Sequence, residues 1–253
     1  MTKLELHNPF NAPIYHIETV SSTMDVSKQL ASAGEAHGTV IIADFQEAGR
    51  GRVRNRSWEM ARGENLPFTI LLRYPKIEDV PPALTLRAGL AVAFAIEDYF
   101  PSLQGFVFVK WPNDIFIGDK KTAGILCEAV GCTIHLGIGI NVLQKILPFH
   151  LQEKATSIAL AAGNYQIDRF SLLEKILDWL FKELEISAFL DWKYRLEERL
   201  YKKGEVVTFI EGAADSCNEI KGYLSGIGKG GELLIVMEGE SMPKEFICGE
   251  FKI

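Results

Sequence analysis

The sequence predicts an α+β protein with two parts, a mixed β-sheet with flanking helices over residues 1–202 and a small β-barrel over residues 203–253. The chain of 253 residues is longer than one average domain. Hydrophobic residues make up 47% and charged residues 24%, which is the balance of a globular protein with a sizeable core. From about Gly204 onward, long periodic segments give way to short strands separated by glycines, so the second part begins there.

The first part alternates strands and helices. A helix is predicted to begin after Ser21-Ser22-Thr23, whose hydroxyls can cap free backbone N–H groups, and to end at Gly34. A core helix is predicted over 82–99, and amphipathic helices over 168–189 and 191–200, from their apolar spacing. The predicted strands, rich in β-branched and aromatic residues, are 13–20, 38–46, 66–74, 105–110, 115–117, 123–130 and 133–141.

The second part is predicted to be a barrel of short strands that begins near Tyr201-Lys202-Lys203. Glycines at 212, 226, 228, 230 and 231 mark its turns. The predicted strands are 205–210, 219–224, 232–237 and 245–248.

Charge and terminal composition restrict the class of protein. The 27 Lys and Arg against 33 Asp and Glu give a net charge of −6, so the surface as a whole repels nucleic acid and any anion site must be local. The first ten residues lack the basic and apolar regions of a signal peptide. Since no run approaches the roughly 18 apolar residues of a membrane span, we expect no membrane partner.

The cysteines indicate an ordinary reducing environment. Cys127, Cys132, Cys217 and Cys248 show no C-x-x-C spacing, and no histidine cluster could complete a zinc site. Reduced and mostly buried thiols in a cytoplasmic protein are therefore expected.

An arginine-rich loop gives the strongest local signal. Within 46–58, arginines occupy the alternate positions 50, 52, 54 and 56 of an otherwise acidic chain, which costs self-repulsion unless an anion binds. Neighbouring glycines let the backbone approach a ligand, and guanidinium groups suit phosphate or carboxylate. Two alternatives remain: arginines that merely face water, and a nucleic-acid contact, which the net acidity disfavours.

Two lysine segments form a second constellation. Lys110-Trp111-Pro112-Asn113-Asp114 is followed after a turn by Lys121-Thr122-Ala123-Gly124, so both lysines could reach one pocket. Asn113 and Asp114 suit Mg²⁺ or nucleotide hydroxyls, although turn chemistry alone explains each of them. In Gly137-Ile138-Gly139-Ile140-Asn141 the glycines leave one strand face bare, either for a flat ligand or through a bulge or tight packing contact.

Together these segments resemble the biotin protein ligases, also called holocarboxylase synthetases. The resemblance covers nearly the whole chain, and its elements occur in the family's order. These are Ser-Thr before the first helix, Gln-x-x-Gly-Arg-Gly-Arg with a following Trp, Lys-Trp-Pro-Asn-Asp, Lys-x-x-Gly-Ile-Leu-x-Glu, Gly-x-Gly-Ile-Asn and a terminal barrel.

The resemblance implies a catalytic domain like that of class II aminoacyl-tRNA synthetases with an SH3-like barrel. It also implies an activity, in which ATP activates biotin to biotinyl-5′-AMP and biotin passes to a lysine of a biotin carboxyl carrier protein, such as that of acetyl-CoA carboxylase. AMP and pyrophosphate are released, and Mg²⁺ is expected with ligands left open.

The resemblance also assigns site residues. Lys121, Arg50 and Arg52 are the implied catalytic residues. The implied biotin-binding residues are Ser22, Thr23, Met24, Gln46, Arg50, Gly51, Arg52, Lys121 and Gly124. The implied ATP- and adenylate-binding residues are Arg50, Arg52, Trp58, Lys110, Trp111, Asn113, Asp114, Lys121 and Asn141. Asp114 is also a candidate by residue type for accepting the proton of the acceptor lysine.

Some features depart from the family pattern. Arg54-Asn55-Arg56 replaces the usual Gly-Arg and makes the loop one residue longer. Ser225 stands where some relatives have an arginine near the nucleotide, so no catalytic residue is assigned to the barrel. Regulatory members carry a winged-helix domain before the core, whereas here the core begins with strand 13–20, so we expect a stand-alone ligase that binds no DNA.

Two other functions remain open at this point. A lipoate protein ligase resembles this fold and would share the lysine. A binding module whose arginine loop contacts an anionic partner is the alternative without chemistry. An edge strand could support a homodimer.

Overall fold

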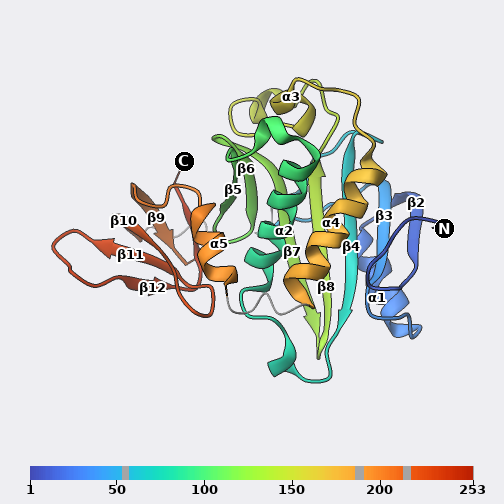
Figure 1. Ribbon diagram of the computed structural model, residues 1–253, viewed down its shortest axis with the longest axis horizontal. Helices are drawn as coiled ribbons and strands as arrows, with labels where there is room; N and C mark the ends of the chain where they lie inside the picture. Colours follow the sequence, from blue (N-terminus) through green and yellow to red (C-terminus); the bar gives the residue numbers. More distant parts are fainter. Residues whose placement is uncertain (53–56, 186–190, 213–217, 253) are drawn as a thin grey trace.

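The protein is described by a computed structural model over residues 1–52, 57–185, 191–212 and 218–252. An eight-stranded sheet dominates it, in the order β1-β2-β3-β4-β8-β7-β6-β5 (Figure 1). Its strands are β1 (Thr2–Leu4), β2 (Ile14–Val20), β3 (Thr39–Gln46), β4 (Asn65–Arg73), β5 (Val107–Lys110), β6 (Asp114–Ile117), β7 (Lys120–Val130) and β8 (Thr133–Asn141). The sheet is mixed because β2 and β3 run parallel while its other pairs are antiparallel.

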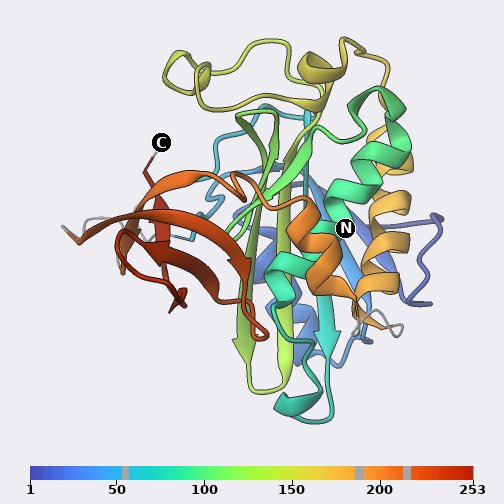
Figure 2. The same cartoon turned by 60° about the vertical axis from the view of Figure 1, so that its left-hand side comes forward.

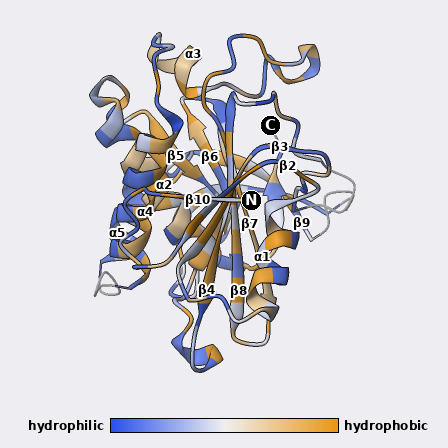
Figure 3. Cartoon of the chain, turned by 90° about the vertical axis from the view of Figure 1, so that its right-hand side faces the viewer, coloured by the Kyte–Doolittle hydropathy of each residue, from blue (hydrophilic) through white to orange (hydrophobic). Residues whose placement is uncertain are grey.

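Helices cover both faces of this sheet. Figure 3 shows α2 (Leu84–Tyr99), α4 (Arg169–Leu184) and α5 (Trp192–Glu198) on one side and α1 (Thr23–Ser32) on the other. A short helix, α3 (Ile158–Ala162), and three 3₁₀ turns, η1 (Ile77–Asp79), η2 (Pro101–Leu103) and η3 (Phe149–Leu151), complete the described helices. The central strands are therefore buried on both faces, which explains the nearly continuous apolar sequence of β3 and β4.

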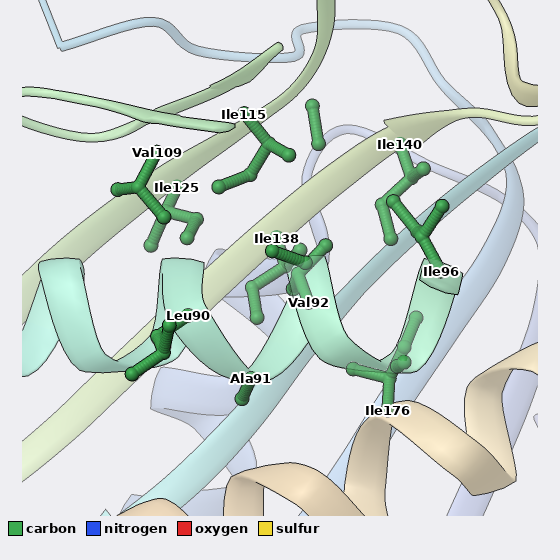
Figure 4. Close-up of a cluster of buried hydrophobic side chains, with 14 of the residues drawn as sticks. Leu90, Ala91, Val92, Ile96, Val109, Ile115, Ile125, Ile138, Ile140 and Ile176 are labelled. Atoms are coloured by element: carbon green, nitrogen blue, oxygen red, sulfur yellow. The ribbon is translucent and has the colours of Figure 1, made fainter. Parts of the chain in front are cut away.

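The main core lies between α2 and the sheet. Val92 and Ile96 pack toward strand residues such as Ile138 and Ile140 (Figure 4). Each such buried side chain contributes about 1.5–3 kcal/mol to folding. Gly89 permits the close approach, because a Cβ there would lie 3.1 Å from Ile115 Cδ1 and 3.2 Å from Val109 Cγ1.

The C-terminal part is a five-stranded antiparallel sheet in the order β12-β11-β10-β9-β13. Figure 2 shows this part, in orange and red, beside the large sheet. Its strands are β9 (Val206–Glu211), β10 (Glu219–Ile227), β11 (Leu233–Met237), β12 (Lys244–Phe246) and β13 (Gly249–Phe251). The chain leaves the large sheet where Leu200 pairs with the edge residue Val109, and it enters β9 at Val206. The predicted α+β class, with a large mixed sheet and a second sheet at the C-terminus, is confirmed; the boundary between residues 202 and 203 stays a prediction.

Polar contacts dock the small sheet on the rest. Trp111 Nε1 donates to the Gly231 carbonyl at 3.0 Å, and its ring lies 5.8 Å from that of Phe209. On the α5 side, Glu197 accepts from the Ile227 amide at 3.1 Å. The two sheets are therefore held together by hydrogen bonds as well as by apolar packing.

Several element predictions need correction. β1, α3 and β13 were not expected, because three- to five-residue elements give too little periodicity. β10 continues to Ile227 through the predicted turn, since a register shift between Leu224 and Gly226 leaves Ser225 unpaired as a bulge, while Gly226, with a φ of +154°, still pairs with Leu234. β7 begins at Lys120 rather than at 123, and α4 ends at Leu184 rather than at 189, while residues 186–190 lie outside the described part.

The cysteine prediction is partly wrong. Cys127, Cys132 and Cys248 are free thiols, but the first two are only half-buried and Cys248 is exposed. Burial nevertheless raises the pKa of the Cys127 thiol to about 11, which keeps it protonated. Cys217 lies outside the described residues.

One segment has the composition of a membrane span, contrary to expectation. The segment Ile77–Tyr99, which contains α2, is long and apolar enough to cross a membrane. However, 67% of its apolar stretch is buried inside the protein. α2 is a core helix packed on the sheet.

Candidate active site

A cavity opens on the α1 face of the sheet. Ile125, Ile138 and Ile140 point to the α2 face, so the alternating Gly124, Gly137 and Gly139 face α1 (Figure 4). The cavity is lined by Ser22, Thr23, Met24, Gln46, Arg50, Gly51, Arg52, Trp58, Phe68, Asn113, Lys121, Gly124, Ile125, Leu126, Gly137, Ile138 and Gly139. The N-terminus of α1, the end of β3, the arginine loop and the paired strands β7 and β8 thus meet at one place.

Glycines form the floor of the cavity. A Cβ on Gly139 would lie 2.9 Å from Trp58 Cε2, and one on Gly137 would lie 3.0 Å from Met24 Sδ. A Cβ on Gly124, which lies opposite Gly139 in the ladder, would lie 3.1 Å from Trp58 Cζ3. In this structure the bare strand face accommodates Trp58 and Met24, so tight packing accounts for these glycines.

Hydroxyl and amide groups form one polar corner. The Thr23 amide and hydroxyl both donate to Gln46 Oε1, at 2.8 and 3.0 Å, and the hydroxyl lies 2.8 Å from Thr69 Oγ1. Ser22 caps α1 by accepting from the Met24 amide at 3.3 Å. These bonds fix Ser22 and Thr23, each 3% exposed, at the cavity edge.

Lys121 is held by its main chain and its side chain. Its Nζ lies 2.6 Å from Asp114 Oδ1 and 5.6 Å from the centre of the Trp58 ring. Its amide donates to the Lys154 carbonyl, and its own carbonyl accepts from the Thr156 amide, both at 2.9 Å. Lys121 is therefore a cation of fixed position in the cavity wall.

The Trp58 ring has an unsatisfied polar atom. Its Nε1 is buried and has no hydrogen-bond partner among the described residues. Leaving a buried donor unpaired costs about 1–3 kcal/mol, so an acceptor on a ligand or a shift of the ring would relieve this cost.

The arginines of the loop have different partners. Arg50 Nη2 donates to Asp25 Oδ1 at 2.6 Å and to Ser22 Oγ at 3.3 Å. Arg52 Nη2 donates to the Gly249 carbonyl at 3.1 Å, so this side chain reaches the C-terminal sheet. The unusual segment Arg54-Asn55-Arg56 lies outside the described residues.

Four of the predicted site residues do not line the cavity. Asp114 does not line the cavity, but it contacts Lys121, which does. Trp111 is 2% exposed and lies at the junction of the two sheets. Asn141 accepts from Asn65 Nδ2 at 2.9 Å and donates to the Thr156 carbonyl at 3.1 Å. The remaining residue, Lys110, is described below.

Lys110 is a buried cation behind the site. It lies 5.4 Å from the Phe116 ring and 5.7 Å from the Phe251 ring. Burial lowers the pKa of its ammonium group, and the nearby Lys121 acts in the same direction, while Asp114 opposes both.

Other lining residues were missed by the sequence analysis. Phe68, Ile125, Leu126 and Ile138 also line the cavity, but apolar strand residues carry no sequence signal that separates a cavity wall from a core. The sequence analysis also assigned no role to Asp25 and Glu128, which contact Arg50. Glu128 is the last residue of the Lys-x-x-Gly-Ile-Leu-x-Glu motif. Among the described residues no three His, Cys, Asp or Glu side chains cluster to hold a metal.

Comparison with known proteins gives a consistent result. A family model described as "Biotin/lipoate A/B protein ligase family" matches residues 16–144. The chain is 39% identical over 175 residues to "Bifunctional ligase/repressor BirA" of Bacillus subtilis, a match that covers 65% of this chain and 51% of the relative. It is 33% identical over 180 residues to "Biotin--[acetyl-CoA-carboxylase] ligase" of Mycobacterium tuberculosis, covering 70% of this chain and 63% of the relative.

Solved structures agree with these matches. The chain resembles a biotin protein ligase from Aquifex aeolicus, solved in complex with biotin and ATP, with a TM-score of 0.77 and 28% identity. That similarity covers 94% of this chain and 97% of the other. The chain spans only about half the length of the Bacillus relative. The family model, however, matches residues 16–144, which are about half of this chain. The chain therefore belongs to the biotin/lipoate A/B protein ligase family.

Proposed function

We propose that this chain is a biotin protein ligase, which forms a C–N bond between biotin and a lysine of a biotin carboxyl carrier protein. One observation carries the proposal: Ser22-Thr23, Gln46, Arg52 and Lys121, from separate elements, line one cavity. Such a cavity offers a polar corner, an apolar wall and cations side by side. It suits a small acid whose carboxylate must meet a phosphate.

The first half-reaction would join biotin to AMP. A biotin carboxylate oxygen attacks the α-phosphorus of ATP, and the bond from that phosphorus to the β-phosphate bridging oxygen breaks, releasing pyrophosphate. Lys121, with Arg52, stabilises the negative charge that builds on the phosphoryl oxygens. We assign Asp114 the role of orienting Lys121, since it lies 2.6 Å from Nζ.

The second half-reaction would transfer biotin to the carrier. The neutral amine of the acceptor lysine attacks the carbonyl carbon of the mixed anhydride, the C–O bond to AMP breaks, and one proton is lost. Because the adenylate is prone to hydrolysis, the loop around Arg50–Arg52 must also exclude water. The buried Nε1 of Trp58 offers a donor to the polar atoms of such an intermediate.

Further parts of the proposal concern metal, location and assembly. Mg²⁺ enters as part of the Mg–ATP substrate, because the described residues offer no metal cluster and Asp114 is already paired. We place the protein in the cytoplasm without DNA binding, on the free thiols of Cys127, Cys132 and Cys248 and the net charge of −6. A homodimer would use the β1 edge, since the β5 edge pairs with Leu200.

The decisive experiment is incubation of the purified protein with labelled biotin, Mg–ATP and a biotin carboxyl carrier domain. We expect the mass of one biotin on a carrier lysine. Pyrophosphate release without transfer would indicate another acid or acceptor, and competition by lipoate would separate the two acids of the family. No release and no transfer would reject the ligase.

A further inference from the structure

Side chains of two other elements bind Arg50 of the arginine loop. Its Nη2 lies 2.6 Å from Asp25 Oδ1 in the first turn of α1, and its Nε lies 4.0 Å from Glu128 Oε1 on β7. The second oxygen of Glu128 pairs with Lys28 of α1. A loop arginine is thereby tied to both the helix and the sheet.

The charges in this group balance. Two cations, Arg50 and Lys28, face two carboxylates, Asp25 and Glu128. A phosphate that approached Arg50 would have to compete with carboxylates already in contact with it. Because its contact with Asp25 is as short as 2.6 Å, Arg50 is better suited to hold the loop than to neutralise a substrate.

Arg50 is itself part of the main-chain attachment of the loop, because it forms an isolated antiparallel bridge with Ser57. The amides of Glu47 and Ala48 donate to the carbonyls of Val20 and Ser21, both at 2.9 Å, and the Trp58 amide donates to the Gly49 carbonyl at 2.9 Å. Arg50 follows directly, and the lining residues Gly51 and Arg52 come next. The side-chain contacts of Arg50 thus extend the attachment to the edge of the cavity.

We propose that Asp25 and Glu128 are positioning residues that hold Arg50, and through it Gly51 and Arg52, over the cavity. This group of Arg50, Asp25, Glu128 and Lys28 is called the loop anchor. The inference rests on the proposed ligase function for its effect on substrates, but not for its effect on the loop. The anchor keeps bound biotin and its adenylate in place and does not touch the reacting atoms.

A first test uses no substrate. The double variant Asp25→Asn with Glu128→Gln removes both charges while keeping side-chain size, and limited trypsin treatment then measures cleavage of the Arg50–Gly51 bond. We expect cleavage roughly threefold to tenfold faster than in the unmodified protein, the range set by two partly exposed ion pairs. A cleavage rate equal to that of the unmodified protein would overturn the proposal.

The matched control removes ion-paired carboxylates elsewhere. Asp191→Asn with Glu219→Gln breaks the contacts of Arg195 and Lys252 with these carboxylates, at 3.1 and 2.5 Å, and none of these four residues lines the cavity. This control should be cleaved at the normal rate. Equally fast cleavage in the control would mean that general loosening, and not the anchor, exposes the loop.

A second test separates positioning from chemistry. In the anchor variant we expect the KM for biotin in ATP–pyrophosphate exchange to rise roughly threefold to tenfold, with kcat changed less than twofold. A KM for biotin equal to that of the unmodified protein would refute the anchor. An unmodified protein that forms no adenylate would reject the ligase function, while the trypsin result would still decide the anchor.

Discussion

Lys121 Nζ and Asp114 Oδ1 lie 2.6 Å apart across the β6–β7 hairpin, at the wall of the cavity. Asp114 ends the Lys-Trp-Pro-Asn-Asp segment and Lys121 begins the next one, so this pair joins two sequence motifs into one site. A carboxylate on the flank of a flexible lysine restricts where its ammonium group can lie. The position of the Lys121 charge is thereby set before any ligand binds.

Replacing Lys121 by alanine should abolish most adenylation without unfolding the protein. Loss of one donor that stabilises developing charge typically slows the reaction about 10²–10³-fold. The fold should survive because the main-chain hydrogen bonds of Lys121 to Lys154 and Thr156 do not need its side chain. ATP–pyrophosphate exchange measures the rate. Lys120→Ala is the control, since that neighbouring lysine bonds to the Gln152 carbonyl, and near-normal exchange in Lys121→Ala would disprove the assignment.

Asp114→Asn should have a smaller effect of about tenfold on kcat, because an amide oxygen still accepts from Lys121 but no longer attracts its charge. Steady-state kinetics of ATP–pyrophosphate exchange measure this change in kcat. The control is Asp119→Asn in the adjoining turn, where Asp119 accepts a hydrogen bond from the Tyr201 hydroxyl at 2.9 Å. The double variant with Lys121→Ala should be no slower than Lys121→Ala alone. A further loss in the double variant would show that Asp114 acts on substrates directly.

The sequence predicted the large elements because their signals are local. The apolar runs of β3 and β4 and the Ser22 cap of α1 need no knowledge of distant residues. β1 and β13 have only three residues each and form by pairing with β2 and β9, so no pattern within them predicts a strand. The bulge at Ser225 likewise depends on its partner strand.

Site residues could be predicted from the sequence where their residue type or motif indicates their chemistry. Arg50, Arg52 and Lys121 were found in this way and line one cavity. The roles of Trp111 and Asn141 depend on partners that no spacing reveals, a carbonyl on the second sheet and an amide on β4. Asp25 gives no signal on its own, because an acidic residue in the first turn of a helix is common for local reasons.

Gly139→Ala should destabilise the protein by about 1–3 kcal/mol, because the new Cβ would lie 2.9 Å from the Trp58 ring. Urea unfolding measures the loss. In a Trp58→Ala background the overlap disappears, so the same substitution should then cost little. An equal cost in both backgrounds would mean that strand backbone, and not the ring, resists the methyl group.

His37 should make stability depend on pH. Its Nε2 lies 3.4 Å from Glu185 Oε1, and this contact is the main cause that raises the pKa of His37 above its ordinary value of 6.5. Because the folded state holds the proton more tightly, the stabilisation is fully present below pH 6.5 and is lost as pH rises through the raised pKa.

For this half-exposed pair the loss should stay below about 1 kcal/mol. Urea unfolding of the protein and of His37→Gln at several pH values measures it. A difference between the two that does not shrink with rising pH would contradict the prediction.

Trp111→Phe distinguishes a structural role from a nucleotide-binding one. The family resemblance places Trp111 on the nucleotide side, yet its indole donates to Gly231 at 3.0 Å and packs on Phe209, away from the cavity lining. Phenylalanine keeps most of the apolar contact but leaves the Gly231 carbonyl without this donor, which should cost about 1–3 kcal/mol. Urea unfolding measures that loss, and the KM for ATP should change less than twofold, because no lining group is removed. A large rise in this KM with unchanged stability would instead place Trp111 against the nucleotide, and the junction of the two sheets would then have to open when ATP binds.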